Sequence, residues 1–586
     1  MRTNVEKTAP SRFRKISAGA LLGAILVVAG GRGTCGTDPF PGRADGYYVR
    51  PVYFVASDET RTDPDWKAKL QTAWIVIRRF YADQMARNGF GQRGFNMELE
   101  ADGRPRIFLY RGRHDLAYYQ KTHDYQTELY EIFSREKDLV AIMGRNAPWT
   151  GGRNVDPNTR GGTAYVGDAD ATVPGTFELD FLRYLSTTVE GQMAMFRDES
   201  IPSNPLDPAK NWKTGAIASA RIGGTAHELG HALGASHACE GQEFMSFGFY
   251  GFRNHFIAAN GPTICAGNAL IFNNSAFFRS ETSYSDKADP VVEFEFPLVK
   301  VGTPIPFRVS GSDSESGPAF LGLTYGWVMY HYADLRAGGK TFTYNYDWTP
   351  DKPLPIGTYG ADVFLLDRTS LRTYRSAPFR VVPSIPPVPP PPDLDPNEVV
   401  FVEDGLPAGT KSFGGTWYWN STYKASGAKG LVHPTEGNPR TQVFFLDSPT
   451  KFPIATGDLL SAYVYIAPGE VPDMLAVTWF KAPSGWSTSA YWGADQLVDW
   501  DKSRPPRVRA GDVPKAGGWV RLAVPASAVG LGGVSLQGLG LSAFKSGAVF
   551  KSGTLFWDRI GKVARGGVAP LPGATVPDAK RPDKPE

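Results

Sequence analysis

The spacing of apolar residues along the first half of the chain predicts strands that alternate with helices. Residues 47–57 alternate aromatic and β-branched residues with other types, which is typical of a strand. From Trp66 to Tyr81, apolar residues recur at helical spacing after an Asp-Pro-Asp start. The same reasoning predicts a hairpin over 95–110, a helix over 125–136, a buried strand over 139–143, a helix over 181–196 and a long helix over 217–233. This order of elements favours one α+β unit over residues 47–285.

The pattern changes to short strands after residue 285. Residues 286–382 contain runs such as PIPFRVSGSD and YGADVFLLD between turn residues, and this spacing predicts an immunoglobulin-like β-sandwich. The proline-rich segment 383–397 is expected to be a stiff spacer. Residues 398–566 again have many strand-like runs, so the predicted fold class is multidomain, with an α+β domain followed by two all-β sandwich domains. Residues 567–586 are rich in Pro, Ala and Lys and are expected to be disordered.

The first 31 residues have the composition of an export signal. Basic residues end at Lys15, and an apolar run of fourteen residues, Ile16–Ala29, follows. A membrane-spanning helix needs about 20 apolar residues, so a signal peptide over 1–31 is favoured over a short membrane anchor. No later stretch is apolar enough to span a bilayer, and the mature protein is expected to be secreted or at the cell surface. A lipid anchor at Cys35 is disfavoured, because Arg32 stands where such signals need an apolar residue.

The charge of the chain argues against nucleic-acid binding. The net charge is +3, but residues 1–31 contain five basic residues and one acidic residue, which leaves about −1 on the rest. The remaining sequence shows no basic face of the kind that binds phosphate groups.

One stretch of eleven residues carries the chemistry of the α+β unit. It begins at His227 and reads His-Glu-Leu-Gly-His-Ala-Leu-Gly-Ala-Ser-His. In a helix, His227 and His231 lie on one face, so both imidazoles can bind the same ion. Gly234 can end the helix in a left-handed conformation, which lets the chain return with His237 as a third ligand. Three imidazoles leave one position open on a tetrahedral Zn²⁺ ion, as in catalytic rather than structural sites.

Glu228 is the candidate general base. It lies about 100° around the helix from His227, beside the expected ion rather than on it. A carboxylate there can accept a proton from a zinc-bound water. The alternative is a helix that carries histidines by chance, but three histidines with a glutamate and a glycine at these spacings favour the metal site.

These residues resemble the metzincin clan of zinc endopeptidases. That clan has a tight turn with a methionine under the metal, and here Met245 follows His237 by eight residues, a short spacing like that of matrixins. The resemblance implies a metzincin-like catalytic domain with one Zn²⁺ ion on the three histidines and Met245 packed below it. Phe247 stands where some members have a tyrosine that is a further zinc ligand, so no such ligand is expected.

The resemblance also implies how a substrate binds. In metzincin-like folds an edge strand above the cleft pairs with extended substrate, and we expect the short strand with Ala164 and Tyr165 to do this. An ordinary loop with a short strand is the alternative. The residues after the methionine turn, among them Phe249 and Tyr250, are expected to form an apolar side-chain pocket.

Two further features of this unit stay open. Cys239 and Cys265 lie on either side of the methionine turn and could form a disulfide, which export would allow. Asp168 and Asp170 could bind Ca²⁺, but a solvated turn is the simpler explanation for them.

The C-terminal unit resembles a jelly-roll-like module of bacterial surface proteins, through AYWGA, GWVRLAVPASAVGL and WDRIGKV. Exposed aromatic residues can stack on sugar rings, which predicts a carbohydrate or another cell-surface ligand, whereas filling of the sandwich core is the alternative. The aromatic residues are Trp417, Tyr418, Trp419, Trp479, Trp486, Tyr491, Trp492, Trp500, Trp519 and Trp557.

Together these patterns predict an exported zinc-dependent endopeptidase that acts on protein or peptide substrates. A zinc-bound water would attack the scissile carbonyl, and Glu228 would accept its proton and pass it to the leaving amine. One alternative is a zinc hydrolase of non-peptide amides. The other is a surface carbohydrate- or protein-binding protein with an idle peptidase-like domain, which the intact motif disfavours because Glu228 serves catalysis rather than folding.

Overall fold

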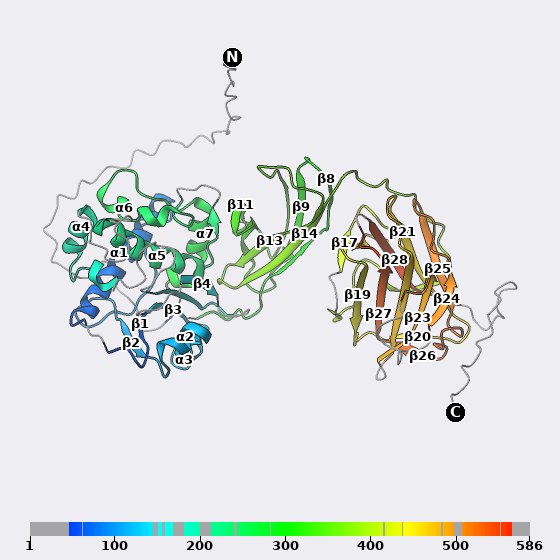
Figure 1. The fold of residues 1–586 in the computed structure, drawn as a ribbon, viewed down its shortest axis with the longest axis horizontal. Helices are drawn as coiled ribbons and strands as arrows, with labels where there is room; N and C mark the ends of the chain where they lie inside the picture. Colours follow the sequence, from blue (N-terminus) through cyan, green and yellow to red (C-terminus); the bar gives the residue numbers. More distant parts are fainter. Residues whose placement is uncertain are drawn as a thin grey trace, which may run out of the picture.

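The protein is a β-rich chain of mixed α/β structure whose parts lie in a row (Figure 1). We call residues 46–285 the α/β part, residues 286–382 the middle sandwich and residues 398–564 the C-terminal sandwich. The computed structural model describes residues 46–564, apart from 61–62, 123, 145–149, 155–158, 168–180, 200–212, 239–242, 282, 414–416, 436, 482–484, 497–506 and 551–552. The expected signal peptide, the C-terminal tail, Cys35, Asp168, Asp170 and Cys239 therefore lie outside the described residues.

The α/β part is built on a five-stranded sheet in the order β2-β1-β3-β5-β4. Strand β4 runs antiparallel to β5 and forms one edge, whereas the other strands are parallel. The strands are β1 (Tyr48–Val55), β2 (Phe108–Arg111), β3 (Asp138–Gly144), β4 (Thr150–Asn154) and β5 (Gly162–Gly167). The helices are α1 (Trp66–Arg87), α2 (Leu116–Thr122), α3 (Tyr125–Leu129), η1 (Phe181–Tyr184), α4 (Val189–Arg197), α5 (Thr214–Ala232), η2 (Gly248–Gly251), α6 (Asn254–Ile257), α7 (Ala266–Asn274) and η3 (Ala276–Phe278).

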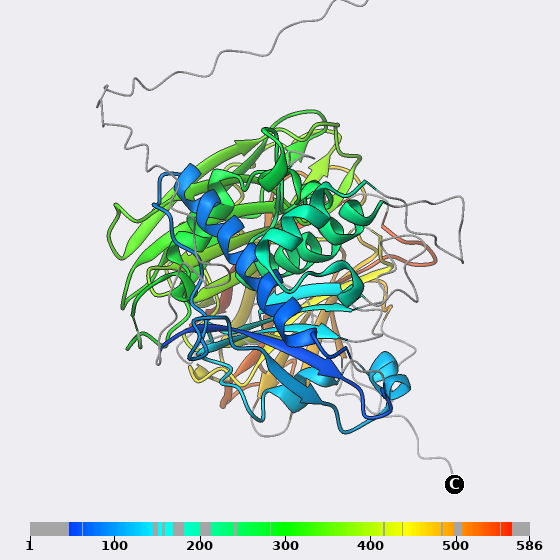
Figure 2. The ribbon, with the colours of Figure 1, turned by 90° about the vertical axis from the view of Figure 1, so that its left-hand side faces the viewer.

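The alternation of side chains in β1 explains why helices cover both faces of this sheet. Val49, Tyr53 and Val55 join the core below α1 and α5. Val52 and Phe54 point to the opposite face, where they pack with residues of α2 and α3. Figure 2 shows α1 crossing the sheet beside α5.

Several predicted elements differ in extent from those in the structure. The expected helix over 125–136 ends at Leu129, and the Ser134 N–H donates to an Asp138 carboxylate oxygen (2.7 Å), a side-chain bond that competes with helix formation. The expected helix over 181–196 is broken, because Thr188 caps a new helix by accepting from the Gly191 N–H at 3.1 Å. The expected hairpin over 95–110 is formed only near its turn, where Leu99 and Pro105 form an isolated bridge. The residues after it form β2, which pairs with β1 instead.

The middle sandwich contains a six-stranded sheet, β6-β11-β10-β13-β14-β8, and a three-stranded sheet, β12-β9-β7. Its larger sheet is buried on both faces. Leu321 and Leu365 point into the sandwich, whereas their neighbours Phe320, Phe364 and Leu366 join the core of the α/β part. The strands are β6 (His237–Ala238), β7 (Val291–Phe294), β8 (Leu298–Lys300), β9 (Ile305–Ser312), β10 (Pro318–Tyr325), β11 (Val328–Asp334), β12 (Thr341–Trp348), β13 (Gly357–Asp367) and β14 (Arg372–Val382).

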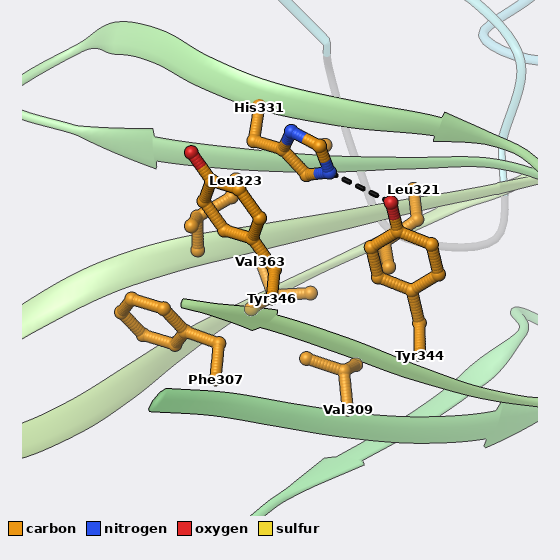
Figure 3. A pocket seen from close by; sticks show the side chains of 9 residues that line it. Phe307, Val309, Leu321, Leu323, His331, Tyr344, Tyr346 and Val363 are labelled. Carbon is orange, nitrogen blue, oxygen red and sulfur yellow. Dashed lines mark hydrogen bonds between the residues drawn. The ribbon is translucent and has the colours of Figure 1, made fainter. Parts of the chain in front are cut away.

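A small apolar pocket lies between the two sheets of the middle sandwich (Figure 3). His331 lines it, with Nε2 2.7 Å from the Tyr344 hydroxyl oxygen and its ring stacked on Tyr346 at 3.7 Å. Burial lowers the pKa of His331. The other lining residues are Phe307, Val309, Leu321, Gly322, Leu323 and Val363. This histidine is thus part of the sandwich packing.

The C-terminal sandwich has two larger sheets, β17-β18-β28-β21-β25 with β15 on β28, and β16-β19-β27-β22-β23-β24. Trp417, Trp479, Trp492 and Trp557 are buried in its core, so these four rings are not available to stack on a surface ligand. The Trp500 ring lies outside the described residues. The strands are β15 (Glu398–Val402), β16 (Lys411–Phe413), β17 (Tyr418–Asn420), β18 (Gly430–Pro434), β19 (Arg440–Leu446), β20 (Phe452–Ile454), β21 (Leu459–Ile466), β22 (Met474–Lys481), β23 (Gly485–Gly493), β24 (Arg507–Gly511), β25 (Trp519–Pro525), β26 (Val534–Leu536), β27 (Gly538–Phe544) and β28 (Thr554–Val563).

The proline-rich segment 383–397 does not act as a spacer that holds the sandwiches apart. Its Pro386 carbonyl oxygen accepts a hydrogen bond from the Tyr423 hydroxyl at 2.6 Å, so the segment lies on the C-terminal sandwich. The two sandwiches also touch directly, since the Phe296 N–H donates to the Trp419 carbonyl oxygen (2.9 Å). The contacts of this segment with the Tyr423 hydroxyl, and of Phe296 with strand β17, could not be predicted from the proline-rich composition alone.

Among the described residues, no helix is long and apolar enough to cross a membrane.

The shared core predicts that the α/β part is not stable alone. A fragment of residues 46–285 loses the contacts of Phe320, Met329, Phe364 and Leu366, each of which contributes about 1.5–3 kcal/mol when buried. That loss is comparable with the total stability of a domain, about 5–15 kcal/mol. We expect the fragment to aggregate or to lack a cooperative thermal transition in circular dichroism, unlike the chain of residues 46–564. A monomeric fragment that melts at the temperature of the longer chain would contradict the shared core.

Candidate metal centre

Helix α5 carries the first two histidines of the motif and ends where the sequence predicts. The Ala235 N–H donates to the Gly230 carbonyl oxygen at 2.9 Å, and Gly234 has a φ of +101°, a left-handed conformation that favours glycine. The chain then turns back into β6, which begins with His237. Local sequence thus positions all three histidines within one short helix-and-turn segment.

The three imidazoles converge at their Nε2 atoms. His231 Nε2 lies 3.0 Å from His227 Nε2 and 3.1 Å from His237 Nε2. Ligands at Zn–N distances of 2.0–2.1 Å in a tetrahedral set are about 3.3 Å apart, so this spacing fits one Zn²⁺ ion. The sequence prediction that His227, His231 and His237 lie together agrees with this geometry.

The other ring nitrogens select the form of histidine that binds metal. His227 Nδ1 lies 3.1 Å from the Phe244 carbonyl oxygen, and His231 Nδ1 lies 2.8 Å from the Ala235 carbonyl oxygen. A carbonyl oxygen can only accept, so each Nδ1 is protonated and donates, and each Nε2 keeps its lone pair.

Burial also keeps these rings neutral. It lowers the pKa of His227 to about 3, with repulsion from His231 as a smaller cause. Burial likewise lowers the pKa of His231 to about 4 and lowers the pKa of His237. Neutral imidazoles are the ligand form, so the donor set suits a divalent metal.

Met245 packs directly below the helix. Its side chain is fully buried, and a Cβ on Gly230 would overlap the Met245 sulfur, so the glycine makes this close packing possible. The buried Tyr81 of α1 donates from its hydroxyl to the Ala226 carbonyl oxygen at 2.7 Å. Phe249 lies beside the first ligand, with its ring 4.7 Å from that of His227. Tyr250 stacks on Phe249 at 4.1 Å, so both expected pocket residues are near the metal ligands.

The backbone around His237 is held by residues outside the motif. Asn268 of α7 bonds the backbone of Ser236, donating to its carbonyl oxygen at 2.9 Å and accepting from its N–H at 3.2 Å. The Ser246 hydroxyl bonds the Ala238 N–H and carbonyl oxygen at 3.2 and 2.9 Å. Strand β11 of the middle sandwich pairs with β6, with Val328 opposite His237. Sequence reasoning missed these contacts, because they join backbone segments that are far apart in the chain.

The expected substrate strand is not the edge of the sheet. Ala164 and Tyr165 lie in β5, which pairs with β3 on one side and with β4 on the other. Ala164 is buried, and Tyr165 packs against Tyr125 at 5.5 Å. The prediction that these two residues bind substrate by main-chain pairing is therefore wrong. Strand β4 was not predicted, because its residues Thr150–Asn154 include two glycines and show no strand pattern.

Strand β4 is the edge of the sheet, and it lies on helix α5, which carries His227 and His231. A Cβ on Gly152 would overlap the Glu228 carbonyl oxygen and approach His231 Cβ at 2.9 Å. Glycine at this position therefore brings β4, the last strand of the sheet in the described part of the chain, next to the motif.

Two exposed aromatic residues lie next to the segments that hold the third ligand. Phe247 is 74 % exposed and follows Ser246, which bonds the Ala238 backbone. Trp327 is 84 % exposed and precedes Val328, the partner of His237. Its φ of +71° belongs to the two-residue turn Gly326–Trp327 that joins β10 to β11, a hairpin turn in which both residues have positive φ. Neither residue was a predicted substrate contact.

Comparison with known proteins gives only distant likenesses. No protein-family model and no curated protein matches the chain. The crystal structure of wild type OgpA from Akkermansia muciniphila matches at a TM-score of 0.38 and 16 % identity, over 59 % of this chain and 96 % of that one. Catalytically inactive OgpA in complex with an O-glycopeptide substrate matches at a TM-score of 0.38 and 17 % identity, over 59 % and 95 % of the chains.

A β-sandwich carbohydrate-binding module matches at a TM-score of 0.19 and 15 % identity, over 48 % of this chain and 100 % of that one. Scores and identities this low assign no function to this chain.

The converging imidazoles predict one tightly bound metal ion. The wild-type chain is expected to retain about one Zn²⁺ ion after dialysis, measured by inductively coupled plasma mass spectrometry, and His237→Ala is expected to bind it at least about 100-fold more weakly. His114→Ala is the matched control, because that exposed histidine stacks on Tyr118. Equal zinc retention by the His237 variant would show that the ion, if any, binds elsewhere.

Proposed function

We propose that the protein is a zinc-dependent endopeptidase with His227, His231 and His237 as metal ligands and Glu228 as general base. The observation that carries the proposal is the convergence of three imidazoles: His231 Nε2 lies 3.0 Å from His227 Nε2 and 3.1 Å from His237 Nε2. Glu228 lies in the same turn of helix α5 as His227 and His231. Such a set leaves a ligand position open, which a structural zinc site does not.

Each residue of the motif has a defined part in the reaction. When bound, Zn²⁺ supplies Lewis-acid chemistry, which polarises a carbonyl group and lowers the pKa of water towards about 7. Glu228 accepts the proton of the attacking water and donates it to the amine that leaves. Met245 and Tyr81 fix the helix from below, so that the base and the ligands keep their relative positions.

The free edge of β4 favours a peptide over a small amide as substrate. An extended peptide can add to this edge by main-chain hydrogen bonds, and the close packing of Gly152 on α5 places it beside Glu228. With a peptide bound along β4, the exposed rings of Phe247 and Trp327 contact side chains of the substrate. The burial of four tryptophans in the C-terminal sandwich weighs against a protein whose main role is sugar binding by that unit.

The general base gives the direct test of this function. Glu228→Gln is expected to keep one Zn²⁺ ion per chain and to lower peptide hydrolysis at least about 100-fold, the smaller end of the contribution of a positioned base. Glu131→Gln, at an exposed ion pair with Arg113, is the matched control and should keep full activity.

The substrates are a peptide library with unmodified and O-glycosylated members, read by mass spectrometry. Cleavage by the Glu228 variant at the rate of the wild type would refute the proposed role. Zinc binding without any cleavage of either kind of peptide by the wild type would refute the peptidase assignment.

The exposed Trp327 is expected to affect substrate binding rather than folding. Trp327→Gly removes an aromatic contact, which is expected to raise KM about 3- to 10-fold, and removes a conformation that costs about 1–2 kcal/mol for a non-glycine residue. The melting temperature should be unchanged or higher. Asp447→Gly, at another positive φ in the C-terminal sandwich, is the control for strain and should leave KM unchanged. A fall in kcat with an unaltered KM would contradict a binding role for Trp327.

A further inference from the structure

Three buried aspartates meet where the α/β part joins the middle sandwich. Asp286 lies in the segment that leaves the α/β part, Asp313 follows β9, and Asp367 ends β13. Each is at most 3 % exposed, and carboxylate oxygens of all three lie within 4.8 Å of one another. Burial of carboxylates this close together is costly unless a cation balances their charge.

Two carboxylate oxygens of the cluster accept no hydrogen bond from the described residues. Asp313 Oδ1 accepts from the backbone N–H groups of Glu315, Ser316 and Gly317 at 2.7–2.9 Å. Its other oxygen, Oδ2, is buried without a partner among the described residues, and so is Oδ2 of Asp286. Asp367 has more hydrogen-bond donors, since its Oδ2 accepts from the hydroxyl groups of Ser316 and Thr369.

Nearby arginines act on these carboxylates only without direct contact, and the buried Arg372 interacts electrostatically with Asp367. The buried guanidinium of Arg160 bonds the Asp286 carbonyl oxygen, the Thr369 carbonyl oxygen and the Thr369 hydroxyl. In the described part of the chain, no lysine or arginine forms an ion pair with Asp286, Asp313 or Asp367. Burial raises the pKa of Asp367 to about 7, with the charge of Asp286 as a smaller cause. Burial acts in the same direction on Asp286, but side-chain hydrogen bonds with Glu315 and Ser316 outweigh it and lower the pKa of Asp286.

We propose that Asp286, Asp313 and Asp367 bind one Ca²⁺ ion at this junction. Ca²⁺ takes six to eight oxygen ligands at 2.3–2.6 Å, so two ligands of one ion are at most about 5 Å apart, and the carboxylate oxygens of all three aspartates lie within that limit. The unpartnered oxygens of Asp286 and Asp313 become ligands. Mg²⁺ fits less well, because it demands near-ideal octahedral geometry and keeps several waters, whereas these carboxylates are buried.

The ion would fix the loop that connects the two parts. The residues after Asp367 reach back into the α/β part, where the Ser370 hydroxyl accepts from the Ala276 N–H at 3.1 Å and Thr369 accepts from Arg160. Ser370 has a φ of +81°, so the loop holds a strained conformation that a bound ion would stabilise. This site is separate from the histidines and does not depend on the proposed peptidase activity.

Calcium titration of the full chain tests this site. The protein carries Glu228→Gln to prevent self-cleavage, is stripped of metal and is reloaded with one equivalent of Zn²⁺. We expect isothermal titration calorimetry to detect one Ca²⁺ per chain. Saturating CaCl₂ should raise the melting temperature by about 5 °C, and MgCl₂ should have much less effect.

Asp313→Asn in the same background separates a metal site from a protonated cluster. The asparagine keeps the oxygen that accepts the three N–H groups and replaces only the unpartnered one with an amide. Without Ca²⁺ this variant should be at least as stable as the parent, but Ca²⁺ should bind at least about 10-fold more weakly and no longer raise its melting temperature. Asp351→Asn, at an exposed carboxylate of the same sandwich, should respond like the parent.

Two outcomes would overturn the proposal. The first is a parent protein without calcium binding and without a thermal shift, which would mean that protons alone neutralise the aspartates. The second is full calcium affinity in Asp313→Asn, which would place the ion elsewhere in the chain.

Discussion

The structure depends on the position of the third histidine. Helix α5 can place two imidazoles on one face by its own geometry, but His237 comes after a reversal of the chain and needs support from elsewhere. That support comes from Asn268, from Ser246 and from β11 of the middle sandwich. A metal site of this kind is only as well ordered as its least constrained ligand, because the ion needs all three nitrogen atoms at fixed distances.

The strand that pairs with His237 belongs to a sandwich that shares its core with the α/β part. The larger sheet of the sandwich sends alternate residues to its two faces, and Phe320 and Phe364 pack into the α/β part. Buried Arg160 joins the same two parts through Thr369. The middle sandwich thus supports the backbone at His237. The domain boundary expected at residue 285 stays a prediction from the sequence pattern.

The sequence predicted the features that depend on local spacing. The helix end at Gly234 and the pair His227–His231 follow from helical periodicity and from glycine conformation, whereas the position of Met245 is what the resemblance to metzincins implies. Contacts between distant segments could not be predicted in this way. Strand β4 lacks a strand pattern because Gly152 is needed for close approach to α5. The cluster of Asp286, Asp313 and Asp367 could not be predicted either, because its members come from three separate segments and no one segment carries a signature of it.

The most direct test is an anomalous-difference map of crystals of the full-length Glu228→Gln protein, collected at the zinc absorption edge. If the three histidines bind zinc, we expect one strong peak within about 2.0–2.1 Å of the Nε2 atoms of His227, His231 and His237, with β6 paired to β11. A structure in which His237 does not contact the metal, or in which β6 is detached from the middle sandwich while the metal is bound, would contradict this expectation.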